Sequence, residues 1–216
     1  DEKYVNWMDS CFWDVYGEIF DSDAGLFNRD ARSKPHKTRN GKKVLWSRGN
    51  GWAFGGVTRI LKHLPKDHGS YARYQALYIQ MAESLAARQQ TDGFWRPNLD
   101  DPEQYRMRES SGTGFFTYGI AWGINNGILD RERFLPVAKN GWAALASVVN
   151  EEGAVTWNQL PISSINEDSW EKFCLYVPQT PWLGQGSLFD QIRLGDTSIT
   201  DGDIAQAIRQ AGLEDM

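Results

Sequence analysis

The sequence predicts an all-α fold, in which paired helices form a double ring or arc, an α/α toroid. Three observations lead to this prediction. Amphipathic runs of helical length alternate with runs that are rich in small residues. A glycine-centred turn follows each amphipathic run, at intervals of about 60 to 70 residues. The chain has 216 residues and is 41% hydrophobic, which fits one globular domain with a substantial core.

The outer helices are predicted from the amphipathic runs over residues 3–20, 71–90 and 131–149. In each run apolar residues recur every three or four positions and leave one polar face. Ser70 and Asp130 stand directly before the second and third runs, where a short polar side chain can cap a helix. Helices of this kind lie with their polar face toward water, so we expect them on the outside.

The inner helices are predicted from runs that carry small residues. Residues 110–124 contain no charged side chain and are rich in glycine. Glycine costs about 1 kcal/mol relative to alanine inside a helix, so close packing must favour it here. The run that follows Trp46 and ends at Pro65 carries Gly55 and Gly56 in the same way. We therefore expect these two helices inside, between the amphipathic ones.

Each outer helix ends at a turn that leads into a short extended segment. The turns cover residues 23–27, 92–95 and 151–155. Their spacing is long enough for two helices with their loops, so the repeating unit is a helical hairpin.

The remaining segments are less regular. Residues 31–45 are polar and basic, which is typical of a surface loop. We assign residues 1–165 to the helical barrel, and 166–216 to a divergent C-terminal segment of the same domain. Within that segment residues 196–216 are expected to form a short polar helix or a frayed tail.

Composition excludes several classes of function. The net charge is −5 with lysine and arginine scattered, so nucleic acid is not expected as a partner. No apolar run approaches the roughly 20 residues of a membrane span. The cysteines and histidines lack the spacing of a disulfide framework or a metal site, and we expect no metal or other cofactor. These residues are Cys11, Cys174, His36, His63 and His68.

The segment 46–52 is the strongest functional signal in the chain. It places Arg48 four residues before Trp52 at the predicted start of a helix. With Trp52 in the first helical turn, both side chains point to one side. A guanidinium beside an aromatic ring suits a ligand that has a carboxylate and a sugar ring. The alternative is that both tryptophans of the segment belong to the core and that Arg48 caps a neighbouring helix.

Four stretches resemble glycoside hydrolase family 105, the unsaturated rhamnogalacturonyl hydrolases, and the related unsaturated glucuronyl hydrolases of family 88. The similarity covers roughly residues 1 to 160, and the resemblance implies a six-hairpin α/α barrel. The matching stretches are residues 46–52, 92–95 with 99–102, 109–116 and 121–127.

The resemblance implies a bacterial enzyme that acts on oligosaccharides left by polysaccharide lyases. Such substrates carry a 4,5-unsaturated uronic acid at the non-reducing end. Water is added across the enol-ether double bond, and the resulting hemiketal collapses and releases the sugar. An aspartate acts as the acid and then as the base, without a metal. It must be protonated when the substrate arrives, which requires a raised pKa.

The resemblance also implies roles for particular residues. Arg48 would bind the uronate carboxylate and Trp52 would cover the sugar ring. Asp30 is the carboxylate at the same end of the barrel that could assist acid/base chemistry, with a solvated turn as the alternative. The other residues predicted to bind substrate are Trp46, Asn50, Arg29 and Arg32.

Some features depart from the family pattern. Nothing matches the motif of the family's principal catalytic aspartate, which we expect upstream of Asp1, and three hairpin-like units fall short of six. We therefore expect the C-terminal half of such an enzyme or a truncated relative, in the cytoplasm or periplasm of a bacterium. The alternatives are a carbohydrate-binding helical domain without catalysis and a helical scaffold that binds protein.

Overall fold

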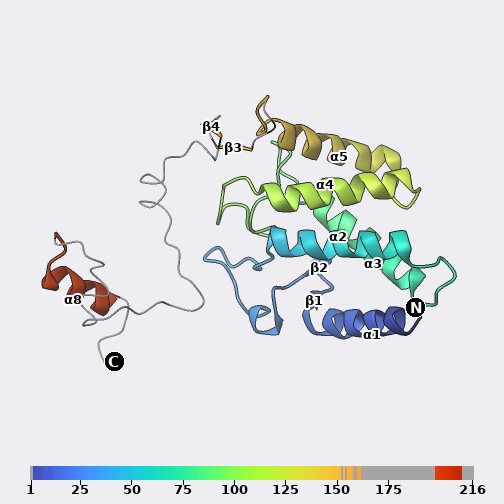
Figure 1. Ribbon diagram of the computed structural model, residues 1–216, viewed down its shortest axis with the longest axis horizontal. Helices are drawn as coiled ribbons and strands as arrows, with labels where there is room; N and C mark the ends of the chain where they lie inside the picture. The colour runs from blue at the N-terminus through green and yellow to red at the C-terminus, as the bar shows by residue number, and fades with distance from the viewer. Residues whose placement is uncertain (1, 152, 154, 158–159, 162–197, 211–216) are drawn as a thin grey trace. The chain divides into compact units, whose positions relative to one another are not determined.

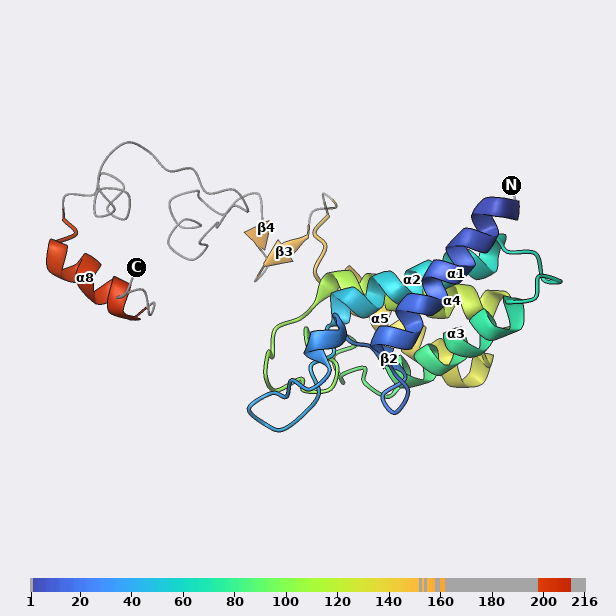
Figure 2. The ribbon, with the colours of Figure 1, turned by 90° about the horizontal axis from the view of Figure 1, so that it is seen from below.

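The computed structural model describes residues 2–151, 153, 155–157, 160–161 and 198–210. The chain divides into two compact units, Asp1–Ser164 and Ile165–Met216. The described part of the first unit contains five α-helices, shown in Figures 1 and 2, and that of the second contains α8 (Asp201–Gln210). The five helices are α1 (Glu2–Ile19), α2 (Ser47–His63), α3 (Tyr71–Ala86), α4 (Ser110–Asn125) and α5 (Arg131–Ala146).

The prediction of an all-α fold with small-residue helices inside is confirmed. In Figure 1 the helices of the first unit run from α1 at the bottom to α5 at the top, and α4 packs against both α2 and α5. Eight residues of α4 are buried, three of them glycines. By contrast, none of the residues of α1 is buried, and in Figure 2 α1 lies in front of the other helices.

Glycine in α4 allows bulky side chains of neighbouring helices to approach closely. A Cβ atom added to Gly119 would lie 2.4 Å from the ring of Phe54, and one added to Gly123 would lie 2.3 Å from the hydroxyl of Tyr78. Real Cβ atoms are essentially never found at such distances, so any other residue at these two positions would force Phe54 or Tyr78 to move. The rings of Phe54 and Tyr78 in turn stack on each other with centroids 4.8 Å apart.

The three predicted turns share one backbone feature. Gly25, Gly93 and Gly153 all have a positive φ, of 66°, 80° and 82°, a conformation that favours glycine. The first turn joins β1 (Phe20–Asp21) to β2 (Leu26–Phe27) as an antiparallel pair. The third precedes β3 (Thr156–Trp157), which pairs with β4 (Leu160–Pro161). The three predicted turns therefore share one glycine conformation, which supports the repeat.

Helix α3 is shorter than predicted. It ends at Ala86, because the N–H of Arg88 already donates to Leu85 and the N–H of Gln90 donates forward to Phe94. These bonds turn the chain into the segment that leads to α4. The predicted end at residue 90 was set by the turn over residues 92–95, because the sequence does not display the hydrogen bonds that end the helix earlier.

The two predicted caps behave differently. Asp130 caps α5, accepting a hydrogen bond of 2.8 Å from the N–H of Arg133. Ser70 occupies the N-cap position of α3, but its hydroxyl donates to Asp9 at 2.7 Å and makes no capping bond. α5 ends at Ala146, three residues before the predicted end. α8 confirms the short helix expected near the C-terminus, and the interpretation of residues 166–197 lies outside the described residues.

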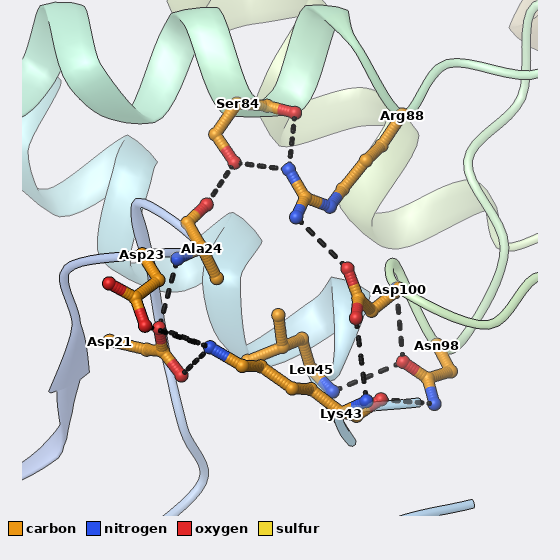
Figure 3. Close-up of polar contacts among 9 residues, drawn as sticks. All are labelled: Asp21, Asp23, Ala24, Lys43, Leu45, Ser84, Arg88, Asn98 and Asp100. Carbon is orange, nitrogen blue, oxygen red and sulfur yellow. Dashed lines mark hydrogen bonds and ion pairs between the residues drawn. The ribbon is translucent and has the colours of Figure 1, made fainter. Parts of the chain in front are cut away.

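A polar network fixes the segment that leads into α2 (Figure 3). The Lys43 ammonium contacts Asp21 at 2.6 Å, and the Asn98 amide bonds the backbone of Lys43 and Leu45 at 3.1 Å each. Burial alone would raise the pKa of Asp21, but the hydrogen bond from Lys43, the backbone hydrogen bond from Ala24 and the charge of Lys43 together lower that pKa. A second ion pair, at 3.0 Å, joins Arg88 to Asp100 within the same network.

Candidate functional site

The predicted site lies at the end of the helices where the loops meet. β2 is joined to α2 there by hydrogen bonds between Phe27 and Asn50. The segment 28–32 follows β2 directly, so it lies at the same end as segment 46–52, as predicted. α2 begins at Ser47, which places Trp52 in its second turn rather than its first.

Arg48 and Trp52 project to one side of α2. Trp52 is 66% exposed and Arg48 is also exposed, and their spacing of four residues puts them on the same helix face. Among the described residues the Arg48 guanidinium has no hydrogen bond or ion pair. The alternative placed both tryptophans in the core and made Arg48 a helix cap, and the structure contradicts it for Trp52 and Arg48, whereas Trp46 is half-buried. An arginine without a protein partner is available for an anionic ligand.

Asn50 has a structural role. It is 1% exposed, and its amide oxygen accepts a hydrogen bond of 2.8 Å from the N–H of Phe27. Its amide nitrogen donates to the carbonyls of Phe27 and Trp46, both at 3.0 Å. These bonds correct the prediction that Asn50 contacts substrate, because its side chain is buried and both of its amide atoms are hydrogen-bonded to the backbone. It positions the loop that carries segment 28–32.

Three of the predicted residues line a cleft between α1 and α2. Its volume is about 250 Å³, and Trp46, Asn50 and Arg29 contribute to its wall. The ring of Trp46 also stacks on Tyr105, with centroids 5.7 Å apart. Arg48 and Trp52 are absent from this lining, so the predicted residues divide between two faces of α2. The other lining residues are Phe12, Val15, Ile19, Phe27, Asn28, Gly49 and Ala53.

Asp30 is unsuited to the role of acid. One of its carboxylate oxygens accepts hydrogen bonds of 2.8 Å from both the N–H and the hydroxyl of Ser33, capping the short helix Ala31–Ser33. The other accepts from Arg29 at 2.8 Å. The bond from Ser33 and that from Arg29 lower the pKa of Asp30 to about 2. A group held ionised in this way cannot deliver a proton at neutral pH.

The charges around Asp30 are distributed unevenly. The charge of Arg29 is paired with Asp30, whereas Arg32 is exposed and has no ion pair within the part of the chain that the structure describes. A cluster of His, Cys, Asp or Glu that could hold a metal ion is not found among the described residues. None of the described helices is long and apolar enough to cross a membrane.

The start of α4 lies beside the start of α2. Glu109 caps α4, with its carboxylate accepting from the N–H groups of Ser111 and Gly112. Further along α4, Phe115 is half-buried and its ring lies 4.6 Å from that of Trp52, and Tyr118 is 47% exposed. The sequence prediction missed these two aromatic residues, because the whole run was treated as buried. Their spacing of three residues is the signal that could have indicated a shared face.

Comparison with known proteins relates most of the chain to one family. The model of the family Glycosyl Hydrolase Family 88 matches residues 1–186. A solved structure described as a glycosyl hydrolase family 88 protein from Bacteroides vulgatus is 39% identical, with a TM-score of 0.69. The match covers 70% of this chain and 44% of that one.

Two curated relatives carry the name unsaturated 3S-rhamnoglycuronyl hydrolase. The protein from Alteromonas sp. is 44% identical over 159 residues, which are 74% of this chain and 38% of that protein. The protein from Formosa agariphila is 39% identical over 180 residues, covering 79% of this chain and 48% of that protein. The chain therefore spans less than half the length of either relative.

Proposed function

The chain belongs to Glycosyl Hydrolase Family 88, and on that premise we propose that it acts on lyase-generated oligosaccharides. The reaction is removal of the terminal 4,5-unsaturated uronic acid by hydration of its double bond. The name shared by the two curated relatives supports a substrate in which the unsaturated uronyl residue is joined to rhamnose.

The observation that carries this proposal is the pair formed by Arg48 and Trp52. The guanidinium of Arg48 has no partner among the described residues and can form two parallel hydrogen bonds to the uronate carboxylate. Trp52, one turn later, offers an exposed indole face to the C–H surface of the ring. A ligand that meets both must combine an anionic group with a ring, which is what a uronic acid does.

The described residues include groups suited to binding the substrate, but the predicted carboxylate among them is not suited to act as the general acid. Protonation of a vinyl carbon requires a carboxylic acid that is still protonated near neutral pH. Asp30, with its pKa held at about 2, does not meet this requirement. This observation favours a second candidate for the chain by itself, namely carbohydrate binding without turnover.

The experiment adds an unsaturated rhamnose-containing disaccharide to the chain and follows the enol-ether absorbance, with calorimetry in parallel. Loss of absorbance that requires Arg48 supports hydrolysis by this chain. Saturable binding at constant absorbance supports the second candidate. If fragments of pectin, ulvan and glycosaminoglycan are neither bound nor consumed, both candidates are wrong.

A further inference from the structure

We infer that Phe115 of α4 is a positioning residue for Trp52, and that two glycines of α2 form the seat that holds its ring. The consequence for sugar binding depends on the function proposed above, whereas the packing does not. Phe115 acts through Trp52, because its ring contacts both the α2 backbone, at Gly51 and Gly55, and the indole of Trp52.

The seat is formed by Gly51 and Gly55, one turn apart on α2. A Cβ atom added to Gly51 would lie 3.0 Å from Cδ2 of Phe115, and one added to Gly55 would lie 2.9 Å from Cδ1. Both atoms belong to the ring of Phe115, so the ring spans both positions. Any side chain at these positions would push the ring away from α2. Glycine weakens a helix, and close contact with the ring accounts for it at both places.

Gly56 shows that the seat is local. It follows Gly55 directly in α2, yet a Cβ atom added there would meet no other atom within 4 Å. The same helix therefore carries one glycine that the ring requires and a neighbour that it does not. This difference provides a matched pair of substitutions with the same change in helix propensity.

The ring of Phe115 sets the direction of the indole. The two ring centroids lie 4.6 Å apart with an angle of 49° between the planes. Trp52 is 66% exposed, and among the described residues Phe115 makes the aromatic ring contact to it. An exposed side chain with two free torsions keeps one orientation only where a neighbour restricts it. The face offered to a sugar thus depends on a residue that need not touch the sugar.

The first test measures the position of Trp52 without any ligand. In the chain labelled with 15N-tryptophan, the indole N–H signal of Trp52 is assigned by its loss in Trp52→Phe. Phe115→Leu should shift that signal and lower its heteronuclear NOE, because the indole gains fast motion. Gly55→Ala should also shift it, and Gly56→Ala should leave it unchanged. An unchanged signal in Phe115→Leu, or equal effects of the two glycine substitutions, would overturn the inference.

The second test measures the affinity for the unsaturated disaccharide together with the thermal midpoint. Phe115→Leu should weaken binding about threefold to tenfold, a range expected for loss of an aromatic contact, with the chain still folded. In Trp52→Ala the further change Phe115→Leu should add little, since Phe115 acts through Trp52. Additive losses would show that Phe115 acts independently and would contradict the inference. If the unsubstituted chain does not bind the disaccharide, the proposed function fails for this chain, while the NMR result still decides the positioning role.

Discussion

The two sides of α2 differ in how they meet their neighbours. Toward α4 the helices are in close contact, with the ring of Phe115 on Gly51 and Gly55, and Phe54 against Gly119. Toward α1 they leave two apolar clefts, of about 250 and 460 Å³, which share Phe12 in their walls. The larger is lined by Val5, Met8, Phe12, Gly56, Arg59, Ile60, His63, Leu64 and Pro65.

The difference shows that a glycine in a helix does not by itself indicate close packing. Gly55 and Gly56 are adjacent, but a ring of the next helix lies against the first and open space lies beside the second. The packed side combines glycines on one helix with aromatic rings on the other. On the open side, α1 has no buried residue, although Phe12 and Trp13 pack against the edge of the core. Stability should therefore be concentrated on the α4 side.

The largest effect is expected from a substitution that removes packing between α2 and α4. Phe54 is fully buried, stacks on Tyr78 and fills the space above Gly119. Phe54→Ala should lower the free energy of unfolding by about 3 to 5 kcal/mol, the usual cost of such a cavity, as measured in denaturant. Phe12→Ala on the open side is the matched control and should cost clearly less, because Phe12 is only half-buried. Equal losses in the two variants would show that the comparison is wrong.

A second effect tests the polar contacts that join β1 to the segment before α2. The pKa of Asp21 in the folded chain lies below its ordinary value of 3.8. The carboxylate therefore adds stability at pH values above the unfolded pKa, and that stability is lost as the pH falls through the folded pKa. Asp21→Asn should lower the free energy of unfolding at pH 7 by about 1 to 3 kcal/mol.

The measurement is a series of denaturant titrations of both proteins between pH 7 and pH 2. The difference between the unsubstituted chain and Asp21→Asn should shrink as the pH falls below 3.8. A difference that does not change over this range would contradict the assigned ion pair with Lys43.

The smallest expected effect concerns the two adjacent glycines. Gly56→Ala should raise the free energy of unfolding by up to about 1 kcal/mol, because alanine favours the helix and its methyl group meets no atom. Gly55→Ala should be neutral or destabilising, since its methyl group displaces Phe115. Thermal unfolding of the two variants side by side checks this. If Gly55→Ala stabilises the chain, an added methyl group fits between Gly55 and the ring of Phe115, and the close contact described for the α4 side is wrong.

Much of the architecture was predictable from the sequence. Apolar periodicity and the runs of small residues located the five helices that the structure describes in the first unit, and the glycine turns indicated the repeat. The resemblance to families 105 and 88 is confirmed by the match to Glycosyl Hydrolase Family 88. Those patterns could not show where hydrogen bonding would end α3 before residue 90.

The candidate site was predicted less well, for a physical reason. Spacing along one helix placed Arg48 and Trp52 on a shared face, but it does not reveal what lies across from each side chain. Asn50 therefore looked like a ligand contact, although its amide is bonded to the backbone of β2. Asp30 was expected to assist acid/base chemistry, but its contacts with Ser33 and Arg29 hold its carboxylate ionised. These are contacts between segments, which a single sequence does not display.

The most direct test of the account measures the thermal midpoint and the oligosaccharide affinity of Arg48→Ala together. Because the Arg48 side chain has no partner among the described residues, its removal should leave the midpoint unchanged. Loss of a charged partner for the uronate carboxylate should cost about 2 to 5 kcal/mol of binding, and Arg48→Lys should recover only part of it. A large fall in the midpoint, with affinity retained by the folded fraction, would contradict the assignment of Arg48 to the substrate.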